Sequence, residues 1–243
     1  MSLIYIILFG LVVLVTHFIE GITGFGCTVL ALPFCIMLAG VKTAVPVLVI
    51  LAWILAIYVI IVDFKHIVWK EFLKIVAFVG LGLPVGMWLF TSLPEGALKK
   101  ILGVFMIVVS IRGLYVSFIG DGKLEYINKY VLGLTLFLGG VVHGAFGSGG
   151  PFVVMYATRA LPDKSNFRAT LCTLWAVLNT VIILRDIGGG IIDTAVLNLL
   201  LWTIPFLVLG MILGNFAHQT IKDKMFTKIV YAVLLVSGFF MFL

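Results

Sequence analysis

The sequence predicts an all-α integral membrane protein that forms a single transmembrane domain over residues 1–243. Hydrophobic residues make up 63% of the chain and charged residues only 11%, whereas soluble proteins carry about 25% charged residues. The mean hydropathy is +1.29, and several apolar runs reach the length of about 20 residues that one bilayer crossing requires. A soluble fold could not bury this much apolar surface, so the lipid bilayer is the predicted surrounding.

The apolar runs, separated by polar residues or by glycine and proline, divide the chain into ten predicted helical segments. They cover residues 3–19, 27–40, 43–62, 72–91, 97–118, 129–142, 151–161, 167–185, 195–217 and 225–242. Segments 27–40 and 151–161 fall short of the roughly 17–25 residues of a spanning helix, and each follows a glycine-rich break. The first segment lacks the basic start of a signal peptide, so we expect it to be retained as a helix.

The two halves of the chain repeat the same features in the same order, which predicts an internal duplication. The repeated pairs are Gly24–Gly26 with Ala145–Gly150, Pro84–Met87 with Val208–Met211, and Lys100–Ile101 with Lys228–Ile229, at separations of 121, 124 and 128 residues. We infer two repeats, at about residues 1–120 and 121–243, with five segments each. Each repeat is predicted to start with a glycine-broken, re-entrant or short helical hairpin.

The basic residues predict how the segments are oriented. If each hairpin enters and leaves on one side, each half crosses three times and the halves form an inverted repeat. One face then carries twelve basic residues: Lys65, Lys70, Lys74, Arg112, Lys123, Lys129, Arg159, Lys164, Arg168, Lys222, Lys224 and Lys228. The other carries four: Lys42, Lys99, Lys100 and Arg185. Because basic loops remain in the cytoplasm, we expect a bacterial or archaeal cytoplasmic membrane protein with both termini outside the cytoplasm.

The two glycine-rich breaks are the predicted substrate-binding region. Irregular backbone within a bilayer is tolerated only where protein or a water-filled cavity surrounds it, and matched breaks in two halves are typical of transport sites. Each break opens a short helix whose first N–H groups suit an anion, although such glycines can also serve helix packing. The candidate residues are Gly24, Phe25, Gly26, Cys27, Thr28, His143, Phe146, Gly147, Ser148, Gly149, Gly150 and Asn179.

Five ionisable residues lie within or beside the apolar segments, where such groups are usually functional. His17, Glu20 and His143 flank the breaks and are candidates for proton coupling; each could instead hydrogen-bond backbone groups freed at the break. Arg168 and Arg185 lie at the two ends of segment 167–185 and are candidates for pathway or gating residues. Arg168 could also cap its helix or extend toward the membrane interface.

The sequence contains no motif of a known enzyme class, no HExxH, GxSxG or Walker A pattern, and we expect no enzymatic activity, no cofactor and no bound metal. Cys27, Cys35 and Cys172 lie in apolar runs without CxxC spacing, so they are interpreted as buried small residues. The net charge of +6 is scattered between apolar runs, which does not favour nucleic-acid binding. The expected partners are a small anion and the bilayer, and the pattern is compatible with a homo-oligomer.

The break motifs resemble those of the TauE/SafE-type family of sulfite and organosulfonate exporters. The resemblance rests on His17–Gly26 followed by Leu32-Pro33, on Gly144–Pro151, and on the run from Arg168 through Asn179 to Arg185. It spans nearly the whole chain and implies export or exchange of small sulfur-containing anions such as sulfite or sulfoacetate. The halves differ at the tips, where Cys27-Thr28 stands in the place of Ser148-Gly149.

The leading hypothesis is therefore a secondary anion transporter that works by alternating access, with both hairpin tips forming a site at the membrane midplane. Two alternatives stay open. One is a membrane enzyme or assembly subunit that uses His17, Glu20 and His143 as metal ligands or as acid and base. The other is a passive anion channel.

Overall fold

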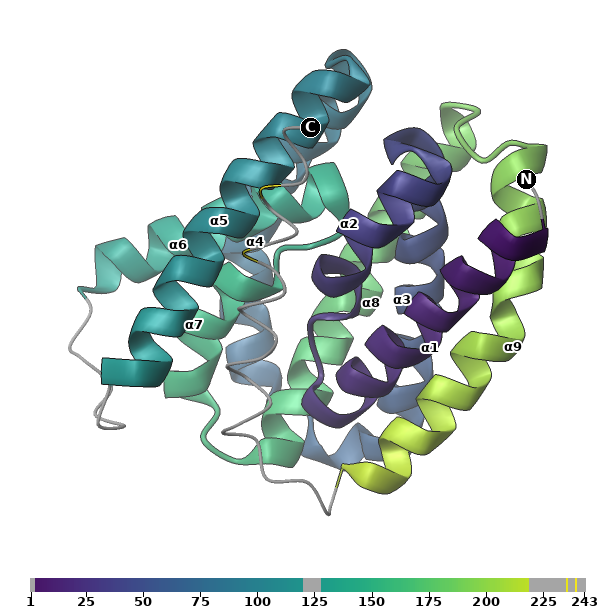
Figure 1. Cartoon of the computed structure of the whole chain (residues 1–243). Helices are drawn as coiled ribbons and strands as arrows, with labels where there is room; N and C mark the ends of the chain where they lie inside the picture. The colour runs from purple at the N-terminus through teal and green to yellow at the C-terminus, as the bar shows by residue number, and fades with distance from the viewer. Residues whose placement is uncertain (1–2, 120–127, 219–234, 236–238, 240–243) are drawn as a thin grey trace.

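The structure, a computed structural model, is all-helical over the residues it describes, which are 3–119, 128–218, 235 and 239. This confirms the predicted fold class. The tenth predicted segment, 225–242, lies outside the described residues except at 235 and 239. The elements are α1 (Leu3–Thr23), α2 (Cys27–Ala39), α3 (Val41–Asp63), η1 (Phe64–His66), α4 (Trp69–Ser92), α5 (Glu95–Ile119), α6 (Lys129–Phe146), α7 (Gly150–Ala160), α8 (Lys164–Gly188) and α9 (Thr194–Ala217) (Figure 1).

Within the described residues, five helical stretches are long and apolar enough to cross a membrane: α1, α3 together with η1, α4, α8 and α9. The helices that follow the two breaks are much shorter, with 13 residues in α2 and 11 in α7. The prediction of two short segments is therefore confirmed. At each break the chain reverses its direction, so that α2 returns beside α1 and α7 beside α6 (Figure 1).

Two helices extend further toward the breaks than predicted. Helix α1 ends at Thr23 rather than at residue 19, and α6 ends at Phe146 rather than at residue 142. Glu20 and His143, which directly follow the two predicted helix ends, remain helical. Their side chains hydrogen-bond Cys27 and Asn179 in the protein interior. Each helix ends where a glycine adopts a positive φ, 81° at Gly24 and 63° at Gly147, a conformation that side chains disfavour.

The helices pack in matched pairs. Helices α3 and α8 form the centre, α1 packs against α9 on one side, and α4 packs against α6 on the other (Figure 1). Both outer pairs approach closely through glycines: a Cβ on Gly86 of α4 would clash with the α6 backbone, and one on Gly210 of α9 would meet the backbone of α1. These glycines serve packing, as in small-residue membrane interfaces. The duplication at residues 1–120 and 121–243 and the inverted repeat both stay predictions.

Candidate functional site

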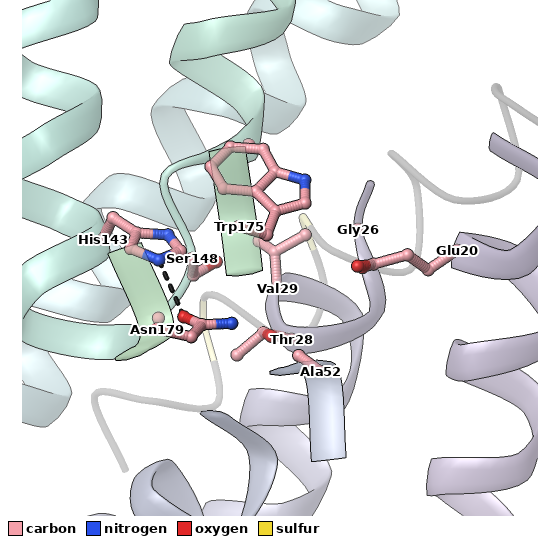
Figure 2. A pocket seen from close by; sticks show the side chains of 11 residues that line it. Glu20, Gly26, Thr28, Val29, Ala52, His143, Ser148, Trp175 and Asn179 are labelled. Carbon is pink, nitrogen blue, oxygen red and sulfur yellow. Dashed lines mark hydrogen bonds between the residues drawn. The ribbon is translucent and has the colours of Figure 1, made fainter. Parts of the chain in front are cut away.

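A small cavity of about 20 Å³ lies between the two breaks (Figure 2). This volume holds about one water molecule, so a larger ligand requires the two breaks to move apart. Ala52 contributes from the middle of α3, so the cavity is about halfway along the central helices. Its lining residues are Glu20, Gly26, Thr28, Val29, Ala52, His143, Gly147, Ser148, Gly150, Trp175 and Asn179.

The first break is held by the protein's own groups. The carbonyl of Gly24 accepts a hydrogen bond from the indole N–H of Trp175 at 3.0 Å. The backbone N–H of Cys27, the first residue of α2, donates to Oε2 of Glu20 at 2.7 Å. The start of α2 therefore already binds a carboxylate, whereas the sequence predicted helix ends available to a ligand at both breaks.

The second break is organised by His143. Its ring stacks on Trp175 with centroids 5.1 Å apart. Its Nδ1 lies 3.4 Å from the backbone N of Gly149, and its Nε2 lies 2.9 Å from Oδ1 of Asn179. One side chain thus links the start of α7 to the middle of α8.

These contacts determine the tautomer of His143. A backbone N–H can only donate, so Nδ1 accepts the bond from Gly149 and the ring proton resides on Nε2. Nε2–H then donates to Oδ1 of Asn179, which turns the Asn179 amide nitrogen away from His143 toward the cavity (Figure 2). In this arrangement the neutral ring orients the amide of Asn179, and proton coupling by His143 stays a prediction.

Ser148 supplies an unused polar group at the cavity. The residue is only 3% exposed, and within the described part of the chain its hydroxyl has no hydrogen-bond partner. A buried hydroxyl without a partner is energetically unfavourable. Ser148 is therefore suited to donate to a bound ligand, next to the amide of Asn179 (Figure 2).

The structure brings seven of the twelve predicted substrate-binding residues to the cavity. The five others, Gly24, Phe25, Cys27, Phe146 and Gly149, do not line it. Three lining residues, Val29, Ala52 and Trp175, were missed by the sequence analysis. Trp175 could have been found, because it precedes Asn179 by four residues and residues at that spacing share a helix face.

Of the three predicted proton-coupling candidates, Glu20 and His143 line the cavity and His17 does not. His17 is fully buried in α1, where its Nδ1 lies 2.8 Å from the carbonyl oxygen of Val13. Its Nε2 has no partner among the residues described. In the same part of the chain no three His, Cys, Asp or Glu side chains gather as metal ligands would, which gives no support to the metal-enzyme alternative.

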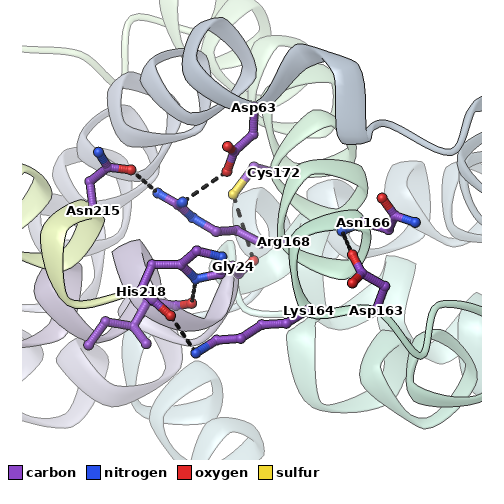
Figure 3. A network of polar contacts seen from close by, with 10 residues as sticks. Gly24, Asp63, Asp163, Lys164, Asn166, Arg168, Cys172, Asn215 and His218 are labelled. Atoms are coloured by element: carbon purple, nitrogen blue, oxygen red, sulfur yellow. Dashed lines mark hydrogen bonds and ion pairs between the residues drawn. The ribbon is translucent and has the colours of Figure 1, made fainter. Parts of the chain in front are cut away.

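Arg168 is the centre of a buried polar cluster at one end of the central helices (Figure 3). Its guanidinium donates to Asp63 at the end of α3 and to Asn215 of α9, at 2.8 and 2.9 Å. Nearby, His218 hydrogen-bonds the carbonyl of Ile22 at 2.6 Å, and Lys164 donates to the carbonyl of His218 at 2.6 Å. This cluster joins α1, α3, α8 and α9.

Arg185 belongs to a second polar cluster at the opposite end of α3 and α8. It pairs with Asp186 and donates to the carbonyl of Met87 at 3.3 Å. Arg185 and Lys42 both lie over the ring of Phe90, at 5.1 and 4.4 Å from its centroid, a favourable cation–π arrangement. The cavity therefore lies between two charged clusters, one at each end of the central pair.

Comparison with known proteins matches residues 8–241 to the family described as "Sulfite exporter TauE/SafE". Over 184 residues, 72% of this chain and 73% of the relative, the sequence is 26% identical to the "Probable inner membrane transporter protein TsaS" of Comamonas testosteroni. No solved structure matches the chain significantly. The findings support an inner-membrane, multi-pass transporter and confirm the resemblance drawn from the break motifs. The chain belongs to the TauE/SafE sulfite exporter family.

Proposed function

We propose that the protein is a secondary transporter that carries a small sulfur-containing oxyanion or organosulfonate across the cytoplasmic membrane. The observation that carries this proposal is the small cavity at mid-depth, which both glycine breaks line. Ser148 and Asn179 offer neutral donors to it, and no lysine or arginine occurs among the described lining residues. Neutral donors bind an anion without the strong charge pairing that would oppose its release.

Alternating access is supported by the two polar clusters. Arg168 joins the ends of α3 and α8 on one side of the cavity, and Arg185 with Lys42 does so on the other. In the proposed cycle one cluster separates while the other stays closed, so the ligand meets one side of the membrane at a time. Arg168 and Arg185, predicted as gating candidates, would be the central residues of the two gates.

The test compares an anion with a neutral molecule of the same shape. Isethionate is expected to bind the purified protein at least about tenfold more tightly than its neutral analogue, 2-hydroxyethyl methyl sulfone. The start of α7, the helix end that Glu20 does not occupy, contributes about 0.3–1 kcal/mol when exposed and up to about 2 kcal/mol when partly buried, and about 1.4 kcal/mol corresponds to tenfold. Isothermal titration measures both affinities, and equal affinity for the two compounds would rule out an anion site.

A second expectation concerns orientation. Because twelve of the sixteen basic residues fall on one predicted face, both chain ends should lie outside the cytoplasm. Fusions of alkaline phosphatase, active only outside, and of green fluorescent protein, fluorescent only inside, would report each end. A fluorescent fusion after Leu243 would contradict the inverted arrangement of the two halves.

A further inference from the structure

Glu20 is a carboxyl group buried in the middle of the protein. It is only 3% exposed and is directed from α1 toward Gly26 at the first break (Figure 2). Together with Ser148 and Asn179 from the second half of the chain, it lines the small cavity between the breaks. Since the cavity holds about one water molecule, an anion that parts the two breaks contacts both walls.

No positive charge compensates Glu20. Within the described part of the chain the side chain forms no ion pair, and the backbone N–H of Cys27 donates to its Oε2 at 2.7 Å. A buried charge without a partner of opposite charge is unfavourable, so a carboxyl group in such a place takes up a proton instead. Because an N–H can only donate, Oε2 acts as the acceptor and the proton of the acid form resides on Oε1.

An anion and an ionised Glu20 cannot share this cavity. Two negative charges in one site repel each other strongly, and one of them is neutralised by a proton. The acid form has the opposite effect, because its O–H is a hydrogen-bond donor. It then joins the hydroxyl of Ser148 and the amide of Asn179 as a third neutral donor.

From this arrangement we infer that Glu20 is the proton-binding residue of the anion site: its acid form binds the anion together with Ser148 and Asn179, and its ionisation expels the anion. The inference rests on the proposed function and adds one proton to the binding of each anion. A singly charged anion and the proton on Glu20 together leave the occupied site without excess negative charge, which favours its enclosure within the bilayer.

Other titratable and charged groups surround Glu20, so a pH effect on binding has to be assigned with variants. Those near the first break or across the cavity are His17 on α1, Cys27 on α2, Asp63 on α3, His143 on α6, Arg168 and Cys172 on α8, and His218 at the end of α9. Within the described residues none of them forms an ion pair with Glu20.

The first test uses the wild-type protein and isethionate. Isethionate remains a singly charged sulfonate from pH 5 to pH 9, so a change of its affinity reports the protein. The affinity should fall as the pH rises, approaching about tenfold for each pH unit above the titration point of Glu20, because one proton binds with each anion. Isothermal titration in two buffers of different ionisation enthalpy should show a proton uptake that approaches one per anion at the alkaline end.

The second test removes the titration of Glu20 and keeps its shape. Glu20→Gln retains an oxygen for the Cys27 N–H and offers an N–H in place of the acid O–H. This variant should bind isethionate as tightly at pH 9 as at pH 5 and take up no proton. Glu95→Gln is the matched control, because Glu95 accepts the N–H of Val41 at 2.9 Å at the start of α3 and does not line the cavity. The control should keep the wild-type pH profile and proton uptake.

A second variant decides the question even if Glu20→Gln does not fold. An imidazolium at His143 would also bind an anion more weakly at higher pH, so His143→Phe removes that source. Its proton uptake should persist although its affinity is lower. Loss of the uptake in His143→Phe would assign the proton to the histidine and overturn the role of Glu20.

The remaining outcomes separate this inference from the proposed function. If isethionate binds more tightly than its neutral sulfone, but with constant affinity from pH 5 to pH 9 and without proton uptake, the anion carrier stands and the role of Glu20 is overturned. A wild-type pH profile in folded Glu20→Gln protein overturns that role as well. If isethionate does not bind at any pH, both proposals fail.

Discussion

Replacing Arg168 with methionine is expected to lower the free energy of unfolding by about 3–5 kcal/mol. That is the usual loss when one partner of a buried ion pair is removed and the other charge stays uncompensated. Arg168 is 1% exposed and donates to Asp63 and Asn215 at 2.8 and 2.9 Å. Methionine keeps most of the side-chain volume, so the loss reports the polar contacts. Unfolding in mixed micelles, titrated with sodium dodecyl sulfate, would measure it.

The control for this variant is Arg112→Met, because Arg112 is exposed on α5 and surface substitutions usually change stability by less than about 0.5 kcal/mol. Adding Asp63→Asn to Arg168→Met should restore part of the lost stability, since it removes the uncompensated carboxylate. Residues in one such network typically show interaction energies of about 0.5–3 kcal/mol. Equal stabilities of Arg168→Met and Arg112→Met would show that the cluster does not hold α3, α8 and α9 together.

The helices could be predicted because their signals are local. Long apolar runs located the long helices among the described residues, and two glycine-rich breaks followed by short segments located α2 and α7. The ends of α1 and α6 could not be located in the same way. Whether Glu20 or His143 interrupts a helix depends on partners distant in sequence, such as Asn179, and the sequence does not show which residues meet in space.

The residues that line the cavity also fall into two groups, those that the sequence predicted and those that it did not. Ser148 and Asn179 were found because polar residues stand out in apolar segments. Ala52 and Trp175 were missed, because an apolar lining residue looks like any other residue of a buried helix. The bond from Cys27 to Glu20 was also beyond prediction, although seven residues separate the two, because it depends on how the backbone turns at Gly24 and Gly26.

The structure shows that Gly147 is a poor position for a substitution that tests the binding site. Bulk at Gly147 would enter the cavity directly, since this residue lines it. However, a Cβ there would lie 2.6 Å from Cγ2 of Val49, and the residue needs a φ of 63°. A substitution would therefore disturb folding together with binding. Asn179 is the better probe, because its side chain can be exchanged without moving the backbone.

Asn179→Leu is expected to weaken anion binding by about 10- to 150-fold while the protein stays folded. Leucine has nearly the same shape but cannot donate to the ligand. A hydrogen bond to a charged group contributes about 1.5–3 kcal/mol, and about 1.4 kcal/mol corresponds to tenfold. Isothermal titration with isethionate would measure the loss. Asn198→Leu is the control, because Asn198 is exposed on α9, and its affinity should match the wild type.

The same experiment can separate the two roles considered for His143. If the neutral ring acts by holding Oδ1 of Asn179 at 2.9 Å, then His143→Phe, which keeps the stacking on Trp175, should weaken binding only through the Asn179 amide. The double variant His143→Phe/Asn179→Leu should then bind no worse than Asn179→Leu alone, a strong departure from additivity. Losses that add up would instead mean that His143 acts on the ligand directly. An affinity that falls as the pH rises through neutrality, and that becomes constant in His143→Phe, would identify that direct action as the charge of an imidazolium.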